Sequence, residues 1–498
     1  MADTYRFGIA IALVALAIML AVLSNRISEK IRVPAPAIFL ISAAVASDLF
    51  PALQHVSVLN VQRVVTLALI PILFDGGMHI GVRRLRGNTG AVVWIGVAGT
   101  AVTAAAVAVL AHALFGFGWL TALLLGTALA PTDPAVVFSV LGRREVVGRS
   151  GVLLEGESGA NDPVGIALMV SLLSAAGASG SAGGSGSAGG SHPFTTGLVE
   201  FVLQMAVGGA IGLVGGYALL YLMRRVALPS EGLYPLRTLA GAAAIYGLAT
   251  VAHGSGFLAV FVAGILLGDA RAPYKTEIER FHSSLASLAE IVAFVMLGLT
   301  VSLRTLPDGN AWLIGLVLAV LLAFVVRPVL VGLLLWPVRL RLGERVFVLW
   351  SGLKGAVPIL LGTFVIVEHQ PDNLRVYDVI FVVVAFSVIV QGGLVPTVAR
   401  RCRVPMHTVE PEPWALGMRF RHQPRGIHRY TVVAGAPADG AVVGDLPLGE
   451  DFWISFVSRH GRLVHVRGDT RLEAGDEVLA LADPDQADVP KRLFTGTG

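Results

Sequence analysis

The chain carries little charge and almost no cysteine, and each shortage excludes a class of protein. Only 14% of its 498 residues are charged while 55% are hydrophobic, proportions far from those of soluble globular chains. Cys402 is the single cysteine, which excludes an intrachain disulfide framework and a cysteine-based metal cluster. Most of the 12 histidines are scattered and not spaced as ligands, so a redox or zinc enzyme is disfavoured. We expect a polytopic membrane protein with no cofactor.

An excess of charge of one sign is also missing. The formal net charge is only +4, and the basic residues lie in the connections between apolar runs and not on one face. A nucleic-acid partner needs a concentrated basic surface. The sequence therefore predicts no nucleic-acid partner.

Long apolar runs, by contrast, are abundant. Runs of about twenty residues, the length that crosses the hydrocarbon core, recur about thirteen times between residues 6 and 400. Their approximate centres are residues 15, 42, 70, 102, 130, 162, 208, 245, 262, 294, 324, 357 and 387. The first run, RFGIAIALVALAIMLAVL, is not followed by a small-residue cleavage site, so we interpret it as a retained span and not as a signal peptide.

The connections between the runs indicate an orientation, because positive residues accumulate on the cytoplasmic side of short loops. Every second connection is strongly basic. The basic groups, one for each such connection, are Arg26, Lys30 and Arg32; Arg83, Arg84 and Arg86; Arg143, Arg144 and Arg149; Arg224 and Arg225; Arg271 and Lys275; Arg339, Arg341 and Arg345; and Arg400, Arg401 and Arg403. The connections between these carry at most one Lys or Arg. This alternation predicts a multi-pass protein of the inner (plasma) membrane with its N-terminus outside and its C-terminus in the cytoplasm. The Gly/Ser-rich tract from Gly177 to Ser191 is then a flexible extracellular loop.

The composition changes after Val404. Charges become frequent, and short alternating runs such as RYTVVAG, FWISFVSR and DEVLALA are separated by Gly, Pro and Asp, a pattern typical of strands and turns. The segment DPDQADVPKRLF opens with residues that cap a short helix. We therefore expect a transmembrane domain over residues 1–404 and a small cytoplasmic α+β domain over residues 405–498.

Three regions place charge at membrane depth, where a carboxylate costs about 2.5–3.5 kcal/mol on insertion scales and is a functional candidate by default. The first is ALAPTDPAVVF, where Pro131 and Pro134 bracket Thr132 and Asp133. The prolines remove helix hydrogen bonds and free carbonyls in mid-membrane. A simple proline kink with a capping aspartate is the alternative interpretation. Broken helices at this depth are, however, how many transporters build ion sites.

The second region is EGESGANDPVG, in the sixth run. In a helix, Ser158 and Asp162 share one face, and Glu157 and Asn161 share the neighbouring face. Carboxylate, hydroxyl and amide oxygens then converge, a set that suits an alkali cation and not a transition metal. A helix start with acids at the positive end of its dipole is the alternative, and it would account for Glu155.

The third region is WSGLKGAVPILLG, in the twelfth run, where Gly352, Gly355 and Pro358 indicate a break that contains Lys354. Arg327, one run earlier in AFVVRPVL, lies over seven residues inside its run. That is about ten ångströms from the end at helical rise, so internal pairing is favoured over snorkelling to the surface.

The breaks fall in the fifth and twelfth runs, at corresponding positions of two six-span halves. Paired interrupted spans of this kind indicate an inverted-repeat transporter with its site at the repeat interface. A carboxylate in a partly dry cavity binds a proton more readily, whereas a bound cation favours the ionised form. Proton and cation therefore compete for one site, and exchange results if the carrier crosses only when that site is occupied.

The motifs PTDP, ESGAND, RP and GLKGAVP, in this order, resemble the cation:proton antiporters of the NhaP branch, which are related to the animal sodium/proton exchangers. The resemblance covers essentially residues 1–400. It implies a homodimer and electroneutral exchange, because the Asn-Asp pair marks that branch. Asp162 would bind cation or proton, with Ser158 and the backbone of Thr132 as further ligands of the alkali cation.

The resemblance also implies two ion pairs. Glu157 would pair with Arg327, and Asp133 with the basic residue of the twelfth span. The commoner pattern has arginine before GAV, where this chain has Lys354. Lysine keeps the charge but lacks the bidentate fork of arginine.

The tail, roughly residues 408–494, resembles the C-terminal ligand-binding domain of RCK/TrkA regulatory proteins, through its strand pattern and the phrase RLEAGDEVLALADPDQ. Antiporters with such a tail resemble the potassium/proton type, which favours K+ over Na+. The tail would regulate transport by sensing a solute such as a nucleotide. Its candidate anion contacts are Arg462, His465 and Arg467, for which a solvated strand face is the alternative.

Three alternatives stay open or are disfavoured. A sodium/proton antiporter would use the same residues. A ligand-gated cation channel is disfavoured because no filter sequence such as TVGYG is present. An intramembrane enzyme is weaker still, because HEXXH, GXSXG and a catalytic aspartate pair are absent.

Overall fold

The computed structural model describes residues 8, 19, 34–50, 53, 56–141, 144–146, 148–181, 193–270, 272–304, 306–408, 427–447, 453–459, 462–464, 466–481 and 488–495. The chain divides into two compact units, Met1–Val409 and Glu410–Gly498. The predicted span around residue 15 and most of the Gly/Ser-rich tract lie outside the described residues.

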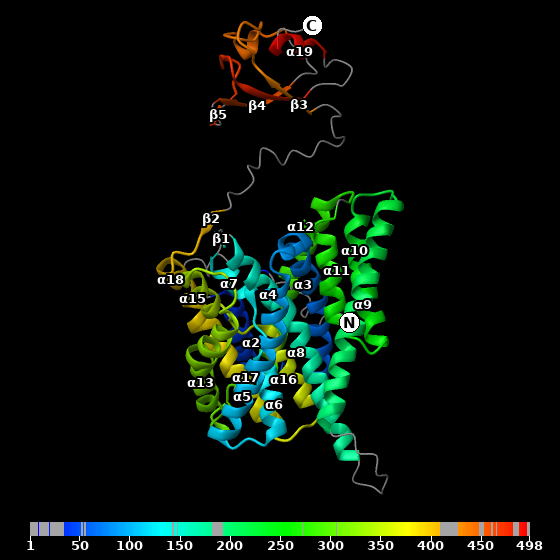
Figure 1. The fold of residues 1–498 in the computed structure, drawn as a ribbon, viewed down its shortest axis with the longest axis vertical. Coiled ribbons are helices and arrows are strands. Elements are labelled where there is room, and N and C mark those ends of the chain that lie inside the picture. The colour runs from blue at the N-terminus through cyan, green and yellow to red at the C-terminus, as the bar shows by residue number, and fades with distance from the viewer. Residues whose placement is uncertain are drawn as a thin grey trace. The chain divides into compact units, whose positions relative to one another are not determined.

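The first unit is a helical bundle whose helices lie side by side along roughly one direction (Figure 1). In its first half the helices are α2 (Ala35–Leu49), α3 (Val58–Arg86), α4 (Thr89–Val93), the π-helix η2 (Trp94–Gly99), α5 (Thr100–Phe115), α6 (Trp119–Leu129), α7 (Pro134–Leu141), α8 (Arg149–Ser181) and α9 (Pro193–Arg225). In its second half they are α10 (Leu233–Val251), α11 (Gly256–Gly268), α12 (Lys275–Leu299), the 3₁₀ turn η3 (Asp308–Asn310), α13 (Ala311–Leu321), the π-helix η4 (Leu322–Val331), α14 (Gly332–Leu334), α15 (Leu342–Trp350), α16 (Ala356–Val367), α17 (Asn373–Phe386), the π-helix η5 (Ser387–Gly392) and α18 (Gly393–Arg401).

The helices bear out a polytopic membrane protein. Within the described residues, eight helical stretches of 23 to 31 residues are long and apolar enough to cross a bilayer, and Ala35–Leu49, Gly256–Gly268 and Ala356–Val367 are shorter apolar helices. The predicted centres from residue 42 to residue 387 fall on described helices or, for residue 130, at the junction of α6 and α7. The total of thirteen spans stays a prediction.

Both predicted helix breaks are present. α6 ends at Leu129 and α7 begins at Pro134, because Pro131 and Pro134 have no N–H to donate. α15 ends at Trp350 and α16 begins at Ala356, with two glycines in the extended segment between them. Each break leaves backbone carbonyls and N–H groups without helical partners inside the bundle.

The core of the bundle surrounds these breaks. Large buried side chains such as Phe74, Phe294, Phe347 and Tyr377 come from α3, α12, α15 and α17. α12 packs on α2 and α3, and it also touches α16. The second break is therefore enclosed by packed helices, where unpaired backbone groups have to find partners in the protein.

A short antiparallel pair closes the first unit. β1 (Arg144–Val146) pairs with β2 (Met406–Thr408). The predicted domain boundary at residue 404 is therefore too early, because backbone pairing attaches β2 to the helical unit, which extends to Val409.

The second unit is the predicted small α+β domain. β3 (Ile427–Thr431), β6 (Glu477–Leu481), β4 (Trp453–Arg459) and β5 (Arg462–Val464) form an antiparallel sheet in that order, with the 3₁₀ turn η7 (Val443–Asp445) and α19 (Asp488–Thr495). Val457 and Val478 pack with Phe494 of α19 in its core. Arg459 donates from Nε to Oδ1 of the buried Asp476 at 2.8 Å. This hydrogen bond raises the pKa of the Arg459 guanidinium.

Candidate ion-binding site

The two helix breaks meet inside the first unit. The backbone N–H of Asp133 donates to the Leu353 carbonyl at 2.8 Å. Lys354 Nζ donates to the carbonyls of Ala130 and Pro131 at 2.9 and 3.0 Å. A Cβ atom at Gly355 would overlap the Asp133 carboxylate, so only glycine permits this approach. Each break thus satisfies backbone groups that the other one frees.

Helix α8 holds the first break through Thr132. Ser158 Oγ donates to the Thr132 carbonyl at 2.6 Å. Asn161 Nδ2 donates to Thr132 Oγ1 at 2.7 Å, and Asn161 Oδ1 accepts from the Thr132 N–H at 3.3 Å. All three residues are at most 5% exposed. The structure therefore brings together the predicted hydroxyl, amide and backbone oxygens.

Asp162 follows directly on the same helix. It is 8% exposed, and its Oδ1 is buried without a hydrogen-bond partner. Ser158 lies one turn earlier on the same face of α8. A buried carboxylate oxygen with no donor is costly, so this atom needs a proton or a cation. Asp162 therefore has an unsatisfied demand for positive charge, whereas Glu157, whose Oε2 also lacks a hydrogen-bond partner, is balanced by Arg327.

Glu157 and Arg327 form a direct ion pair. Arg327 Nη2 lies 2.8 Å from Glu157 Oε1, and both side chains are 6% exposed. Arg327 Nε also donates to the Leu349 carbonyl at the end of α15, at 2.8 Å. A Cβ at Gly352 would overlap the guanidinium. The structure thus shows the expected pair and attaches it to the second break.

The expected pair of Asp133 with Lys354 is not formed. Within the described residues the Lys354 ammonium bonds to the two freed carbonyls of the first break. Asp133 Oδ1 instead accepts from the N–H of Ala135 in the first turn of α7, at 2.9 Å. The prediction of this pair was wrong because the unpaired carbonyls compete with the carboxylate for the ammonium, and Asp133 caps its own helix.

The sequence reasoning missed other polar residues at membrane depth. Asp75 in ILFDGG and Glu290 in LAEIVAF each interrupt an apolar run, and each has a buried carboxylate oxygen without a hydrogen-bond partner. The signal was the one that identified Asp162. Ser387 and Gln391 hold the second break, Ser387 Oγ accepting from the Lys354 N–H at 2.9 Å and Gln391 Nε2 donating to the Trp350 carbonyl at 2.6 Å. An isolated serine or glutamine gives no such signal.

The described residues hold no group of three or more His, Cys, Asp or Glu side chains that could bind a metal ion. The oxygen set around Asp162 instead mixes one carboxylate with a hydroxyl and a backbone carbonyl. Such hard, weakly charged oxygen ligands suit an alkali cation that must bind and leave again. In this site the cation would be cargo and not a resident metal.

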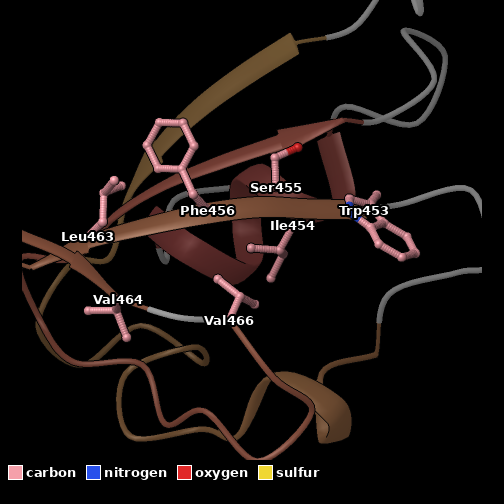
Figure 2. Close-up of a pocket in the computed structure, with 7 residues that line it drawn as sticks. All are labelled: Trp453, Ile454, Ser455, Phe456, Leu463, Val464 and Val466. Atoms are coloured by element: carbon pink, nitrogen blue, oxygen red, sulfur yellow. The ribbon is translucent and has the colours of Figure 1, made fainter. Parts of the chain in front are cut away.

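The tail offers a separate, apolar hollow. Its open volume is about 470 Å³, and its lining consists of Trp453, Ile454, Ser455, Phe456, Leu463, Val464 and Val466. Figure 2 shows these side chains on the hairpin of β4 and β5 and on the segment after it. None of these described lining residues is charged. Of the three candidate anion contacts, Arg467 is exposed, His465 lies outside the described residues, and the side chain of Arg462 is not described.

Comparison with known proteins agrees with this geometry. The transmembrane sodium/hydrogen exchanger family matches residues 11–401, and the TrkA-C domain matches residues 427–495. The K(+)/H(+) antiporter NhaP of Alkalimonas amylolytica is 31% identical over 97% of this chain and 82% of its own length. The K(+)/H(+) antiporter NhaP2 of Shewanella sp. (strain MR-4) is also 31% identical, with the same shares covered.

A more distant relative and a solved structure extend the comparison. The Na(+)/H(+) antiporter ApNhaP of Aphanothece halophytica is 26% identical over 69% of this chain and 65% of its own length. The sodium proton antiporter MjNhaP1 of Methanocaldococcus jannaschii shares the fold, with a TM-score of 0.64 and 24% identity over 78% of this chain and 99% of that one. Since the family match spans the helical unit and both of its breaks, the chain belongs to the sodium/hydrogen exchanger family and carries a TrkA-C domain.

Proposed function

We propose that this exchanger moves K+ against H+ in an electroneutral cycle, with both ions binding in turn at Asp162. The observation that carries the proposal is the buried Asp162 Oδ1 without a hydrogen-bond partner. The K(+)/H(+) antiporter names of the relatives at 31% identity support K+ as the cation. No covalent chemistry is required of the protein.

Competition at one carboxylate gives the coupling. A proton neutralises Asp162, and a cation bound to the ionised carboxylate does so too, so that either ligand offsets the cost of the buried charge. Asn161 cannot ionise, so a single carboxylate of the pair takes part. One cation then exchanges for one proton, which is the stoichiometry of electroneutral exchange.

Ser158 Oγ and the Thr132 carbonyl are the further cation ligands in this proposal, and Asn161 and Asp133 position the break. Thr132 carbonyl already accepts one hydrogen bond from Ser158, and its second lone pair is free to face a cation. The contact between the two breaks lets both move together as the site opens to each side in turn.

Sodium/proton exchange is the second candidate, favoured by the Na(+)/H(+) antiporter ApNhaP among the relatives. The same oxygen ligands would serve either ion. The choice between them therefore needs a transport measurement and not more geometry.

The test uses the purified chain in proteoliposomes with an internal pH dye. An imposed K+ gradient should drive proton movement, a matched Na+ gradient should drive less, and clamping the membrane potential with an ionophore should leave the rate unchanged. Asp162→Asn should insert and fold yet lose exchange in both directions. Asp372→Asn, at an exposed residue before α17, is the matched control and should remain active.

Near-normal exchange by Asp162→Asn would show that another group carries the ions. Exchange driven by Na+ and not by K+ would replace the first candidate by the second.

We further propose a homodimer in the plasma membrane, with the N-terminus outside and the TrkA-C domain in the cytoplasm. Basic residues in the last turns of α3, α9 and α18 support this orientation. The tail would regulate by binding a solute more tightly in one carrier state than in the other. A nucleotide would contact residues such as Arg467, because the described lining of the apolar hollow contains no charged side chain for its phosphates.

A chain ending at Val409 keeps β2 and should therefore keep coupled exchange, with a changed apparent cation affinity or maximal rate in the same assay. A truncated protein that is folded and inserted but inactive would assign the tail an essential role in transport itself.

A further inference from the structure

Helix α12 carries a polar stripe that the ion site does not account for. Its members are Thr276, Arg280, Ser283, Ser287 and Glu290, spaced alternately four and three residues apart. That spacing places them on one face of a helix. Thr276, Arg280 and Ser287 are exposed, and Ser283 and Glu290 are half-buried. After Glu290 the helix continues as the apolar run IVAFVMLGL.

The stripe reaches deep into the bundle. Glu290 lies 15 residues after Lys275, which starts the 25-residue helix, so it is about 22 Å along a helix of about 37 Å. A polar face at this depth is unfavourable against lipid and is tolerated where it is buried in protein or lines water. Because members of the stripe are exposed, water is the environment that the sequence pattern favours.

Glu290 is the member of the stripe that has a buried polar atom without a hydrogen-bond partner. Ser287 Oγ donates to the Ser283 carbonyl at 3.0 Å, so this serine is satisfied by its own helix. Glu290 Oε1 is buried with no hydrogen-bond partner, and the described residues give its carboxylate no ion pair. A carboxylate without a cation at this depth is not explained by helix stability.

The helix that carries Glu290 also borders the ion site. α12 touches α16, whose first turn follows Gly355, the residue against which the Asp133 carboxylate packs. The polar stripe therefore lies on a helix that contacts the helix after the second break.

We propose that the stripe on α12 lines a water-filled passage and that Glu290 holds the monovalent cation on its way between this passage and the site at Asp162. The proposal rests on the exchange function proposed above. Glu290 is then a binding residue of the cation pathway that neither the motifs nor the two breaks include. Its carboxylate raises the local concentration of cations, and the serines of the stripe provide polar walls.

The first test compares Glu290→Gln with Glu279→Gln in the proteoliposome assay. Glu279 lies on the same helix near its start, pairs with Lys275 at 3.2 Å and is 45% exposed, so its substitution removes the same charge outside the bundle interior. Glu290→Gln should raise the apparent KM for K+ about tenfold, equivalent to about 1.4 kcal/mol, with kcat nearly unchanged. Glu290→Asp should recover part of the affinity, and Glu279→Gln should match the wild type.

An unchanged KM in Glu290→Gln would overturn the proposal, as would equal effects of the two glutamine variants. A wild-type protein that shows no exchange at all would instead refute the proposed function, so the two failures are distinguishable.

The second test does not depend on transport. Cys402 is the single cysteine, so Cys402→Ser gives a cysteine-free background for Ser287→Cys and Glu290→Cys. A water-soluble, cationic thiol reagent should modify both positions in membranes, and K+ should slow modification at Ser287→Cys, where the Glu290 carboxylate is intact. Val320→Cys on the apolar helix α13, where the native residue is 40% exposed, should react far more slowly. Failure of both stripe positions to react would exclude the passage.

Discussion

Both helix breaks leave backbone carbonyls without helical partners, and a different buried cation bonds to these carbonyls in each break. Lys354 donates to the carbonyls of Ala130 and Pro131 after α6. Arg327 donates to the Leu349 carbonyl at the end of α15, where a cation also complements the negative end of the helix dipole.

The two breaks differ in how the charge of the buried cation is neutralised. Arg327 has Glu157 at 2.8 Å, so its charge is neutralised within the structure. Lys354 has no such ion pair among the described residues, and carboxylates that include Asp162 act on it only through their electric field. The charge of the first cation is therefore settled by folding, whereas that of the second depends on what occupies the ion site.

This contrast assigns the two breaks different tasks. A proton or K+ on Asp162 cancels the charge that attracts Lys354, whereas an empty, ionised Asp162 restores it. We therefore expect the contact that Lys354 makes between the breaks to respond to the occupancy of the ion site. The Glu157–Arg327 pair, with the Arg327 hydrogen bond to the Leu349 carbonyl, attaches α8 to the second break.

The largest loss of stability is expected from substitutions in the Glu157–Arg327 ion pair. Glu157→Gln and Arg327→Met should each lower stability by about 3–5 kcal/mol, because either change leaves an uncompensated buried charge. The double variant should lose less than either single variant. Thermal unfolding of the wild type, both single variants and the double variant in detergent completes a double-mutant cycle. Additive losses of stability would show that the two side chains are not coupled.

The breaks themselves were predictable from the sequence, because their chemistry is local. Proline has no N–H whatever surrounds it, and glycine marks places where backbone and side chains approach closely. Charges within apolar runs were equally visible, which identified Asp162, Glu157 and Arg327. The pairing of the last two came from the resemblance and is present in the structure.

The partner of Lys354 was not predictable in this way. An ammonium at a helix break can meet a carboxylate or free carbonyls, and the choice depends on how two segments over 200 residues apart cross. Ser387 and Gln391 are ordinary in sequence and become important only because the second break lies beside them. Residues 406–408 read as part of a tail, and only their pairing with β1 assigns them to the bundle.

A smaller loss of stability is expected from removing the Lys354 ammonium, which has no ion-pair partner among the described residues. Lys354→Met leaves the carbonyls of Ala130 and Pro131 without donors, and unsatisfied buried groups cost about 1–3 kcal/mol. It leaves no buried opposite charge at ion-pair distance, so the loss of thermal stability should be smaller than for Glu157→Gln. Lys275→Met is the control, because Lys275 also donates to a carbonyl, that of Leu267 at 2.6 Å, but lies at the start of α12. It should have the smallest effect.

The same variant tests whether Lys354 senses the ion site. A K+ ion at Asp162 faces the ammonium, and removing that repulsion should make K+ bind more tightly. Added K+ should therefore raise the unfolding temperature of Lys354→Met more than that of the wild type, since stabilisation grows with ligand concentration over Kd. In Asp162→Asn the K+ response should vanish with or without Lys354. If Lys354→Met were as unstable as Glu157→Gln and its K+ response unchanged, Lys354 would be a structural cation like Arg327, and the contrast between the two breaks would fail.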